Sequence, residues 1–345
     1  METKKPSRAY LLWLIPLIAG TVYILSVKKN TAVPYQQTKG LIFGTVYSMT
    51  YQHSEDLKIE IEEELKRFDA SLSPFNDSSV ISRVNRNENI VTDTLFRKVF
   101  ERSMQISEET GGTFDITIAP LANAWGFGFK KGAWPGQQTI DSLLELTNYR
   151  NVAMAEGKVI KKDPRIMISC SAIAKGYAVD VSAQFLERKG IKNYMVDIGG
   201  ELYLKGVNSK NEAWRIGINK PIDDSLSVNQ ELQLVLQLTD MGVATSGNYR
   251  NYYYKDGKKY AHTIDPRTGY PVQHNILSAT VVANDCMTAD ALATAFMVMG
   301  REEAKAFVNA RPEIGACFIY SDEDGTFKTC ITEKMKQYVA KDKPY

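Results

Sequence analysis

The sequence contains few residues of the types that form zinc sites or disulfide frameworks. Only 4 cysteines and 3 histidines occur among 345 residues, and no CxxC pair or Cys/His spacing typical of zinc is present. The chain also lacks a strong net charge, because 42 Lys and Arg nearly balance 40 Asp and Glu. No basic run with interleaved aromatic residues occurs, so we do not expect a nucleic-acid partner.

Two of the cysteines bracket a predicted hairpin. Cys317 and Cys330 lie symmetrically about the turn of CFIYSDEDGTFKTC, so they are able to face each other across the two strands. The sequence leaves two alternatives open. They form a disulfide in an oxidising compartment, or they remain two buried thiols.

Charge is absent from one long stretch near the N-terminus. Residues 9–27 are uncharged and mostly apolar, long enough as a helix to cross a bilayer of roughly 30 Å. No cysteine follows, which excludes a lipoprotein anchor. We therefore predict that residues 1–30 are a membrane anchor with one transmembrane helix, with a long signal segment as the alternative. Residues 31–345 would then lie outside the bilayer.

The rest of the chain alternates between helical and extended patterns. Residues 57–73 carry apolar residues at helical spacing, and residues 93–112 do so up to a Gly-Gly stop. Residues 193–282 read as a series of short strands separated by Gly, Asn or Pro. Because no βαβ regularity is present, the sequence predicts an α+β fold with a largely antiparallel sheet and flanking helices, preceded by the transmembrane helix. Before residue 41 we expect a linker, and at 41–52 a strand.

One alanine-rich segment carries two polar residues on a single helical face. In DCMTADALATAF, Asp290 and Thr294 are one turn apart, so their oxygens point the same way. They suit a hard cation such as Mg²⁺ that arrives with a phosphate ligand. The alternative is a buried helix in which Thr294 bonds back to a backbone carbonyl.

Two further motifs carry groups that suit phosphate chemistry. In SCSAIAKGYAVD, Ser169 and Ser171 are expected to cap a helix in which Lys175 offers positive charge to a phosphate. The alternative there is an ordinary capped helix with a solvated lysine. His262 ends a predicted strand before the turn IDPRTG and is able to take a proton from an alcohol; a surface histidine is the alternative.

These motifs belong to an ordered set that resembles a known family, the FAD:protein FMN transferases of the ApbE type. From Phe43 to Phe296 the set reads FGTVYSMT, LSPFNDSSVISRVN, GGTFDITIAPLANAWGFG, SAIAKGYAVD, VDIGGEL, TSGNY, HTIDPRTGYP and MTADALATAF. The resemblance implies an enzyme that binds FAD with Mg²⁺ across the pyrophosphate. It further implies transfer of FMN to a Ser or Thr hydroxyl of a partner protein, with release of AMP, by a catalytic domain of residues 31–345.

The resemblance also implies roles for individual residues. Asp290 and Thr294 match side-chain metal ligands, Ala172 matches a backbone carbonyl ligand, and His262 matches the group that activates the acceptor hydroxyl. The implied FAD contacts are Phe43, Phe75, Thr113, Phe114, Asp115, Ser169, Lys175 and Ile264, with Trp125 as a further ring support. Three of these depart from the common pattern, which has methionine at Phe43, tyrosine at Phe75 and aspartate at Ser169.

Other readings of the same residues remain. If water attacks in place of a protein hydroxyl, the protein is a Mg²⁺-dependent FAD pyrophosphatase that yields FMN and AMP. If it catalyses no reaction, it is a flavin-binding protein. With the anchor, the resemblance implies a bacterial inner-membrane protein whose domain is periplasmic or extracytoplasmic, with a membrane redox subunit as acceptor. Because Cys170 and Cys286 flank the two halves of the expected metal site, we also expect these two thiols to approach each other.

Overall fold

The computed structural model describes most of the chain after the predicted anchor. The described residues are 16, 18–21, 33–128, 134–221, 231–248, 252–255, 258–322 and 324–341, with only the backbone described from 252 to 260. Within these ranges no helix is both long and apolar enough to cross a bilayer. Most of the predicted anchor and the division at residue 30 lie outside them.

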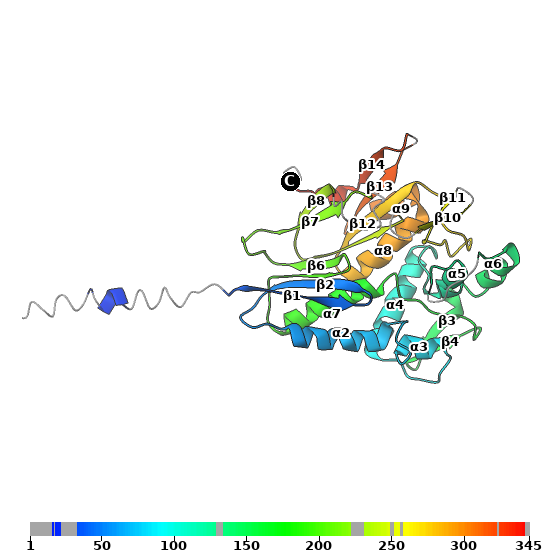
Figure 1. Ribbon diagram of the computed structural model, residues 1–345, viewed down its shortest axis with the longest axis horizontal. Helices are drawn as coiled ribbons and strands as arrows, with labels where there is room; N and C mark the ends of the chain where they lie inside the picture. The colour runs from blue at the N-terminus through cyan, green and yellow to red at the C-terminus, as the bar shows by residue number, and fades with distance from the viewer. Residues whose placement is uncertain are drawn as a thin grey trace, which may run out of the picture.

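One large antiparallel sheet organises the fold (Figure 1). Its eight strands follow the order β1-β2-β5-β6-β9-β12-β13-β14, and every neighbouring pair is antiparallel. The strands are β1 Tyr35–Ile42, β2 Thr45–Gln52, β5 Tyr194–Ile198, β6 Glu201–Lys205, β9 Met241–Gly247, β12 Ile276–Ala283, β13 Gly315–Ser321 and β14 Phe327–Ile331. This confirms the α+β class with a largely antiparallel sheet.

Two central helices cover one face of the sheet. Helix α7 (Ala174–Arg188) packs on β5 and β6, and α8 (Cys286–Met299) packs on β9 and β12 and against α7. Helix α8 is buried along almost its whole length because its residues are nearly all apolar. It therefore has no solvent-facing stripe, and a carboxylate on it must face either another protein group or a cavity.

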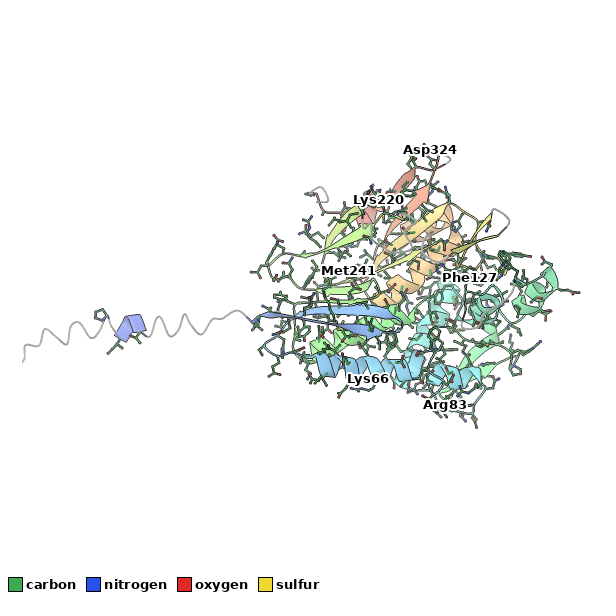
Figure 2. The ribbon with its side chains drawn as sticks, in the orientation of Figure 1. Lys66, Arg83, Phe127, Lys220, Met241 and Asp324 are labelled. Carbon is green, nitrogen blue, oxygen red and sulfur yellow. The ribbon has the colours of Figure 1, made fainter. Side chains whose placement is uncertain are left out.

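Outer helices complete this side of the molecule. Helices α2 (Lys58–Leu72) and α4 (Thr94–Glu109) contact α7 and α8 respectively, and α9 (Arg301–Asn309) packs on α8. Both α2 and α4 are amphipathic, as the sequence predicts; Lys66 projects outward from α2 in Figure 2. Helix α4 begins at Asp93, whose side chain accepts the Phe96 N–H, and ends before two glycines with positive φ.

A hairpin covers the opposite face. Strands β7 (Trp214–Asn219) and β8 (Leu232–Leu238) bury Trp214, Ile216 and Leu236 against sheet residues such as Val243. The short helix α10 (Glu333–Lys336) joins this second core through Met335. Apolar layers therefore lie on both faces of the sheet.

Most of the smaller elements lie on the right of the view in Figure 1. They are α3 Val80–Asn85, η1 Ile116–Ile118, α5 Ala119–Ala124, α6 Gln137–Leu144, η2 Tyr149–Asn151, β3 Val152–Ala155, β4 Lys158–Lys161, β10 Tyr252–Lys255 and β11 Lys258–Ala261.

Several predictions about local structure were wrong. The expected linker before residue 41 contains β1, which pairs with β2 across a turn at Phe43 and Gly44. Helix α7 begins at Ala174 after Ile173, which makes no side-chain cap. Ser169 and Ser171 therefore do not cap it; the Ser169 hydroxyl donates to the Ser171 hydroxyl at 3.1 Å instead.

The possibility of a disulfide in the last hairpin is also excluded by its register. Cys317 pairs with Ile331, whereas Cys330 pairs with Phe318, so the two cysteines are offset by one residue and face opposite sides. All four cysteines are free thiols, and Cys170 and Cys286 are buried in the same core. The hairpin itself, with its turn after Ser321, is as predicted.

Candidate functional site

A cavity of about 560 Å³ lies where the glycine-rich β5–β6 turn meets α5, α7 and α8. This volume is typical of small-molecule sites. Its walls come from widely separated parts of the chain, and the expected site residues that line it are Thr113, Phe114, Asp115, Ser169, Ala172, Lys175, His262, Ile264, Asp290 and Thr294. Most of the residues that the family resemblance implies are thus brought together in one place.

Asp290 and Thr294 face this cavity from the buried helix α8. Asp290 is 4% exposed, and its Oδ2 accepts the N–H of Gly176 on α7 at 2.9 Å. The Thr294 hydroxyl lies 3.0 Å from the hydroxyl of Ser246 on β9. Both side chains are therefore oriented by other elements, and both line the cavity. Among the described residues, no hydrogen-bond donor is assigned to the second carboxylate oxygen of Asp290.

An ion pair between the half-buried Lys175 and the buried Glu201 lies next to Asp290. The ammonium group of Lys175 is 2.6 Å from Oε1 of Glu201, the first residue of β6. Burial, with the charge of nearby Asp290 second, raises the pKa of Glu201 to about 8. Burial likewise raises the pKa of Asp290, and Lys175 opposes that rise. Two carboxylates thus share one lysine, and an added cation would favour the ionised form of both.

The donor set fits a hard cation that also binds its substrate. Asp290 and Thr294 offer side-chain oxygens, and the cavity wall at Ala172 offers a backbone carbonyl, the ligand types that Mg²⁺ accepts. Within the described part of the chain, no group of three or more His, Cys, Asp or Glu side chains could hold a metal. One carboxylate is too little for a dedicated metal cage, so substrate oxygens would have to complete the coordination.

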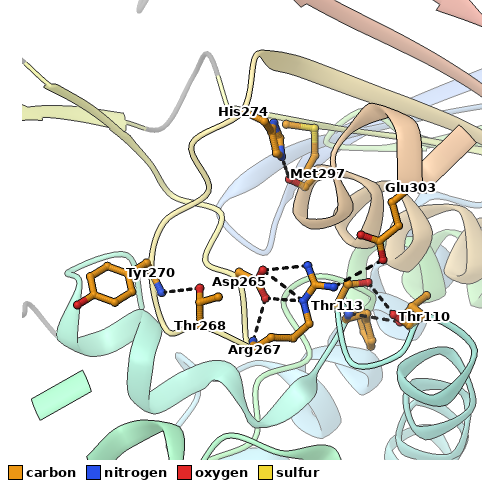
Figure 3. A network of polar contacts seen from close by, with 10 residues as sticks. Thr110, Thr113, Asp265, Arg267, Thr268, Tyr270, His274, Met297 and Glu303 are labelled. Carbon is orange, nitrogen blue, oxygen red and sulfur yellow. Dashed lines mark hydrogen bonds and ion pairs between the residues drawn. The ribbon is translucent and has the colours of Figure 1, made fainter. Parts of the chain in front are cut away.

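Asp115 organises the strip at residues 113–117. Its Oδ1 accepts from the backbone N–H and the hydroxyl of Thr117 at 2.7 and 2.6 Å, and its Oδ2 accepts the Tyr149 N–H at 2.7 Å. Burial raises its pKa. Because both oxygens have protein partners, Asp115 holds the turn that presents Thr113 and Phe114 to the cavity. The Thr113 hydroxyl in turn donates to the Thr110 carbonyl at 3.1 Å (Figure 3).

His262 reaches the cavity just after β11. Its ring is half-buried and meets the edge of Phe127 with centroids 6.4 Å apart; Figure 2 labels Phe127 near α5. The next residue, Thr263, donates its hydroxyl to Asn248 at 2.7 Å, and Ile264 forms a bridge to Pro271. The histidine is thereby placed on a short, fixed segment opposite α8.

The loop after His262 is attached to two helices (Figure 3). Arg267 binds Asp265 within the loop and reaches Glu303 on α9 at 3.6 Å. Farther on, the His274 ring lies 2.6 Å from the carbonyl of Met297 on α8. The helix that carries Asp290 and the loop that follows His262 are therefore held together.

Three expected contact residues are not on the cavity wall. Phe43 sits in the β1–β2 turn with φ 51° and packs on Phe68, with ring centroids 5.4 Å apart. Phe75 is 78% exposed in the loop after α2. Trp125 is buried and donates its indole N–H to the Gly269 carbonyl at 2.8 Å, so it supports the loop after His262.

Glu201 and Ser246 line the site but received no role from the sequence. The available signal for Glu201 was its place in VDIGGEL, directly after two glycines. Gly199 and Gly200 have φ of +68° and +101°, a turn that few other residues adopt and that brings Glu201 to the cavity.

Fold and site together define an α+β class of proteins that gather carboxylate, hydroxyl and ammonium groups around one small-molecule cavity. The ApbE family model matches residues 43–318, and the chain belongs to the ApbE family.

Curated relatives and solved structures agree with this assignment. The chain is 35% identical over 343 residues to the FAD:protein FMN transferase of Vibrio cholerae serotype O1, covering 95% of this chain and 99% of that one. It is 34% identical over 330 residues to the FAD:protein FMN transferase of Escherichia coli K12, covering 91% and 92%. The fold is similar to the flavin transferase ApbE from Vibrio cholerae, with TM-score 0.79, 34% identity and coverage of 88% and 100%. It is also similar to the ApbE protein of Thermotoga maritima, with TM-score 0.77, 27% identity and coverage of 89% and 100%.

Proposed function

We propose that this protein transfers the FMN moiety of FAD to a Ser or Thr hydroxyl of a partner protein, in a Mg²⁺-dependent reaction that releases AMP. Its relatives named FAD:protein FMN transferase cover nearly the whole chain. The observation that carries the proposal is the buried Asp290, which faces the cavity with Thr294 beside the Lys175–Glu201 pair.

Three oxygens would hold the cation: a carboxylate oxygen of Asp290, the hydroxyl of Thr294 and the carbonyl of Ala172. When bound, Mg²⁺ supplies positive charge that neutralises the pyrophosphate and the departing AMP. Lys175 adds an ammonium group on the same side of the cavity. The aromatic ring of Phe114 and the strip that contains it would orient the flavin nucleotide.

His262 acts as the general base. Its imidazole takes the proton of the acceptor hydroxyl as that oxygen attacks the FMN-side phosphorus in line. A new phosphoester bond to the acceptor forms, the bond from that phosphorus to the AMP oxygen breaks, and the proton passes to solvent from the imidazolium. The loop that follows this base is attached to α8, which carries Asp290, and to α9.

The test uses the full chain with FAD, Mg²⁺ and a membrane redox subunit that exposes a Thr or Ser. We expect the acceptor to gain one FMN mass by intact-mass spectrometry, with an equal amount of AMP. His262→Ala should slow transfer by about 10²–10⁴-fold because it removes the base. Asp290→Asn should abolish the response to Mg²⁺.

Asp141→Asn is the matched control, since Asp141 is exposed on α6, outside the cavity lining, and accepts a hydrogen bond from the Gln137 side chain. AMP with free FMN and no acceptor gain would instead assign a pyrophosphatase. FAD that is bound but stays intact would assign a flavin-binding protein. Either result contradicts the transferase.

We further propose that residues 9–27 anchor the protein in the bacterial inner membrane, with the catalytic domain on the periplasmic side near its acceptors. The uncharged length of this run supports the proposal. Membrane fractionation followed by an alkaline carbonate wash tests it: an anchored protein stays in the pellet. Release into the supernatant would contradict anchoring.

A further inference from the structure

Glu201 presents an unusual buried carboxylate to the cavity. The residue is 3% exposed, and its Oε1 receives the Lys175 ammonium group at 2.6 Å. Its Oε2 is buried and has no hydrogen-bond partner in the described part of the chain, although Glu201 lines the cavity. A buried carboxylate oxygen without a donor is destabilising, so its presence calls for a partner that enters with the ligand.

A structural role, in which Glu201 serves only to join α7 to β6, does not explain why its carboxylate is buried at the cavity. A second Lys–Glu pair already joins the same two elements at the surface, where Glu187 on α7 binds Lys205 on β6. The same oxygen of Glu187 also accepts the Tyr194 hydroxyl at 3.0 Å. The Glu187–Lys205 pair holds the two elements together at the surface without an unpartnered buried oxygen. A purely structural role therefore does not account for the buried position of Glu201 at the cavity.

The surroundings of Glu201 point to a donor of one chemical kind. Asp290 and Glu201 line the same cavity. They are held by adjacent residues of α7, since Asp290 accepts the Gly176 N–H and Glu201 binds Lys175, so a cation bound by Asp290 would be a near neighbour of Glu201. Bound Mg²⁺ usually keeps several waters, and each is a strong O–H donor. The hydroxyls of a flavin nucleotide are O–H donors as well. Polar partners that orient water or ligand around a metal site commonly tune its affinity.

We propose that Oε2 of Glu201 accepts a hydrogen bond from an O–H of the bound ligands, either a water on the cation or a hydroxyl of the nucleotide, while Oε1 keeps Lys175 in place. Glu201 is then a binding residue of the site, additional to the expected metal and FAD contacts. The inference rests on the proposed function for the identity of the ligands, but it concerns binding and is tested without group transfer.

The experiment measures FAD binding to the full-length protein by quenching of flavin fluorescence. Titrations are done in EDTA and at increasing Mg²⁺ with wild type, Glu201→Gln and Glu187→Gln. Glu201→Gln keeps the shape of the side chain but weakens the acceptor. We expect Glu201→Gln to weaken FAD binding by about tenfold or more when Mg²⁺ is present. Glu187→Gln, which changes the glutamate of the surface pair between α7 and β6, should bind FAD as the wild type does.

The two conditions separate the two donors. If the donor is water on the cation, FAD binding in EDTA is unchanged and the Mg²⁺ midpoint rises about tenfold. If it is a nucleotide hydroxyl, binding is weakened equally in EDTA and in Mg²⁺. Glu201→Asp, which keeps the charge but withdraws the oxygens, should share the defect, and circular dichroism checks that each variant is folded.

Wild-type affinity for both Glu201→Gln and Glu201→Asp under both conditions would overturn the inference. A wild type that binds FAD but transfers no FMN would overturn the proposed function and leave the role of Glu201 standing. A wild type that binds no FAD in either condition would overturn both.

Discussion

Asp180 connects the two central helices through both of its carboxylate oxygens. It lies on α7 and accepts the N–H groups of Cys286 and Met287, at the first turn of α8, at 2.8 Å each. Burial raises its pKa, whereas the two N–H bonds lower it. Because Asp290 lies one turn farther along α8, Asp180 helps to set the position of the candidate metal ligand.

Asp180→Asn should therefore lower the free energy of unfolding by about 1–3 kcal/mol. An amide has only one acceptor oxygen, so one of the two buried N–H groups loses its partner. Asp285→Asn is the comparison at the same helix end: Asp285 uses one oxygen, on the Thr288 N–H, and asparagine caps helices as well as aspartate. Urea denaturation measures both variants. Equal losses would contradict this account of Asp180.

Some residues of the site could be predicted from the sequence and others could not. Asp290, Thr294 and His262 were available from motif spacing and family resemblance, and all three line the cavity. For Glu201 the motif VDIGGEL marked the preceding turn but not a role, because that role depends on the surroundings of a buried oxygen, which are set by packing between α7 and β6. Asp115 was expected to touch FAD, but its bonds to Thr117 and Tyr149 give it a structural task that no motif reveals.

At the scale of elements, α7 and α8 approach each other at a glycine. A methyl group added at Gly176 would lie 2.3 Å from the carbonyl oxygen of Cys286 and 2.7 Å from Cβ of Asp290. The same residue donates its N–H to Asp290. The close approach of the two helices and the orientation of the carboxylate thus depend on one position without a side chain.

We expect Gly176→Ala to destabilise the fold by about 1–3 kcal/mol, the range for overpacked cores. It should also weaken the Mg²⁺-dependent part of FAD binding, since α8 must move away and take Asp290 with it. Gly136→Ala, at a helix N-cap with open space around it and negative φ, is the control. Thermal melts and FAD titrations at several Mg²⁺ concentrations measure these effects; a fully stable Gly176→Ala protein would contradict the packing argument.

Elements were predictable where one side of them carries an apolar pattern. Helices α2 and α4 have such patterns and were found near their true bounds. Strand β1 was missed because it is an edge strand, with Thr38 as its one buried residue, so its sequence looks like a linker. The start of α7 was placed too early, since serines before a helix look like caps even when, as here, they bond to each other.

The site as a whole draws on segments from residue 113 to residue 298, so ligand binding and global stability are coupled. A ligand that binds only the folded form stabilises it by about 2.7 kcal/mol at 100 times its Kd. FAD and Mg²⁺ added together should raise the melting temperature by more than the sum of their separate effects, because the cation needs substrate oxygens to complete its coordination.

Removal of Mg²⁺ with EDTA should return the melting temperature to that with FAD alone. In Asp290→Asn the two effects should become simply additive, whereas Asp141→Asn should keep the wild-type behaviour. Differential scanning fluorimetry measures each protein in four conditions: without ligand, with FAD, with Mg²⁺ and with both. Additive shifts in the wild type would contradict a shared site for the cation and FAD.

The pairing of β2 with β5 has a consequence for how the chain reaches its native state. The side chains of Gln52 and Asn193, which join these strands, are 141 positions apart in the sequence. Bringing two such distant segments together costs conformational entropy before their contacts can stabilise the pairing. During synthesis the edge of β2 that later pairs with β5 must therefore stay open while most of the helical layer is still being made. An unpaired edge of that kind attracts other extended chains. The folding of this protein should accordingly be slow, and most vulnerable to aggregation before β5 emerges.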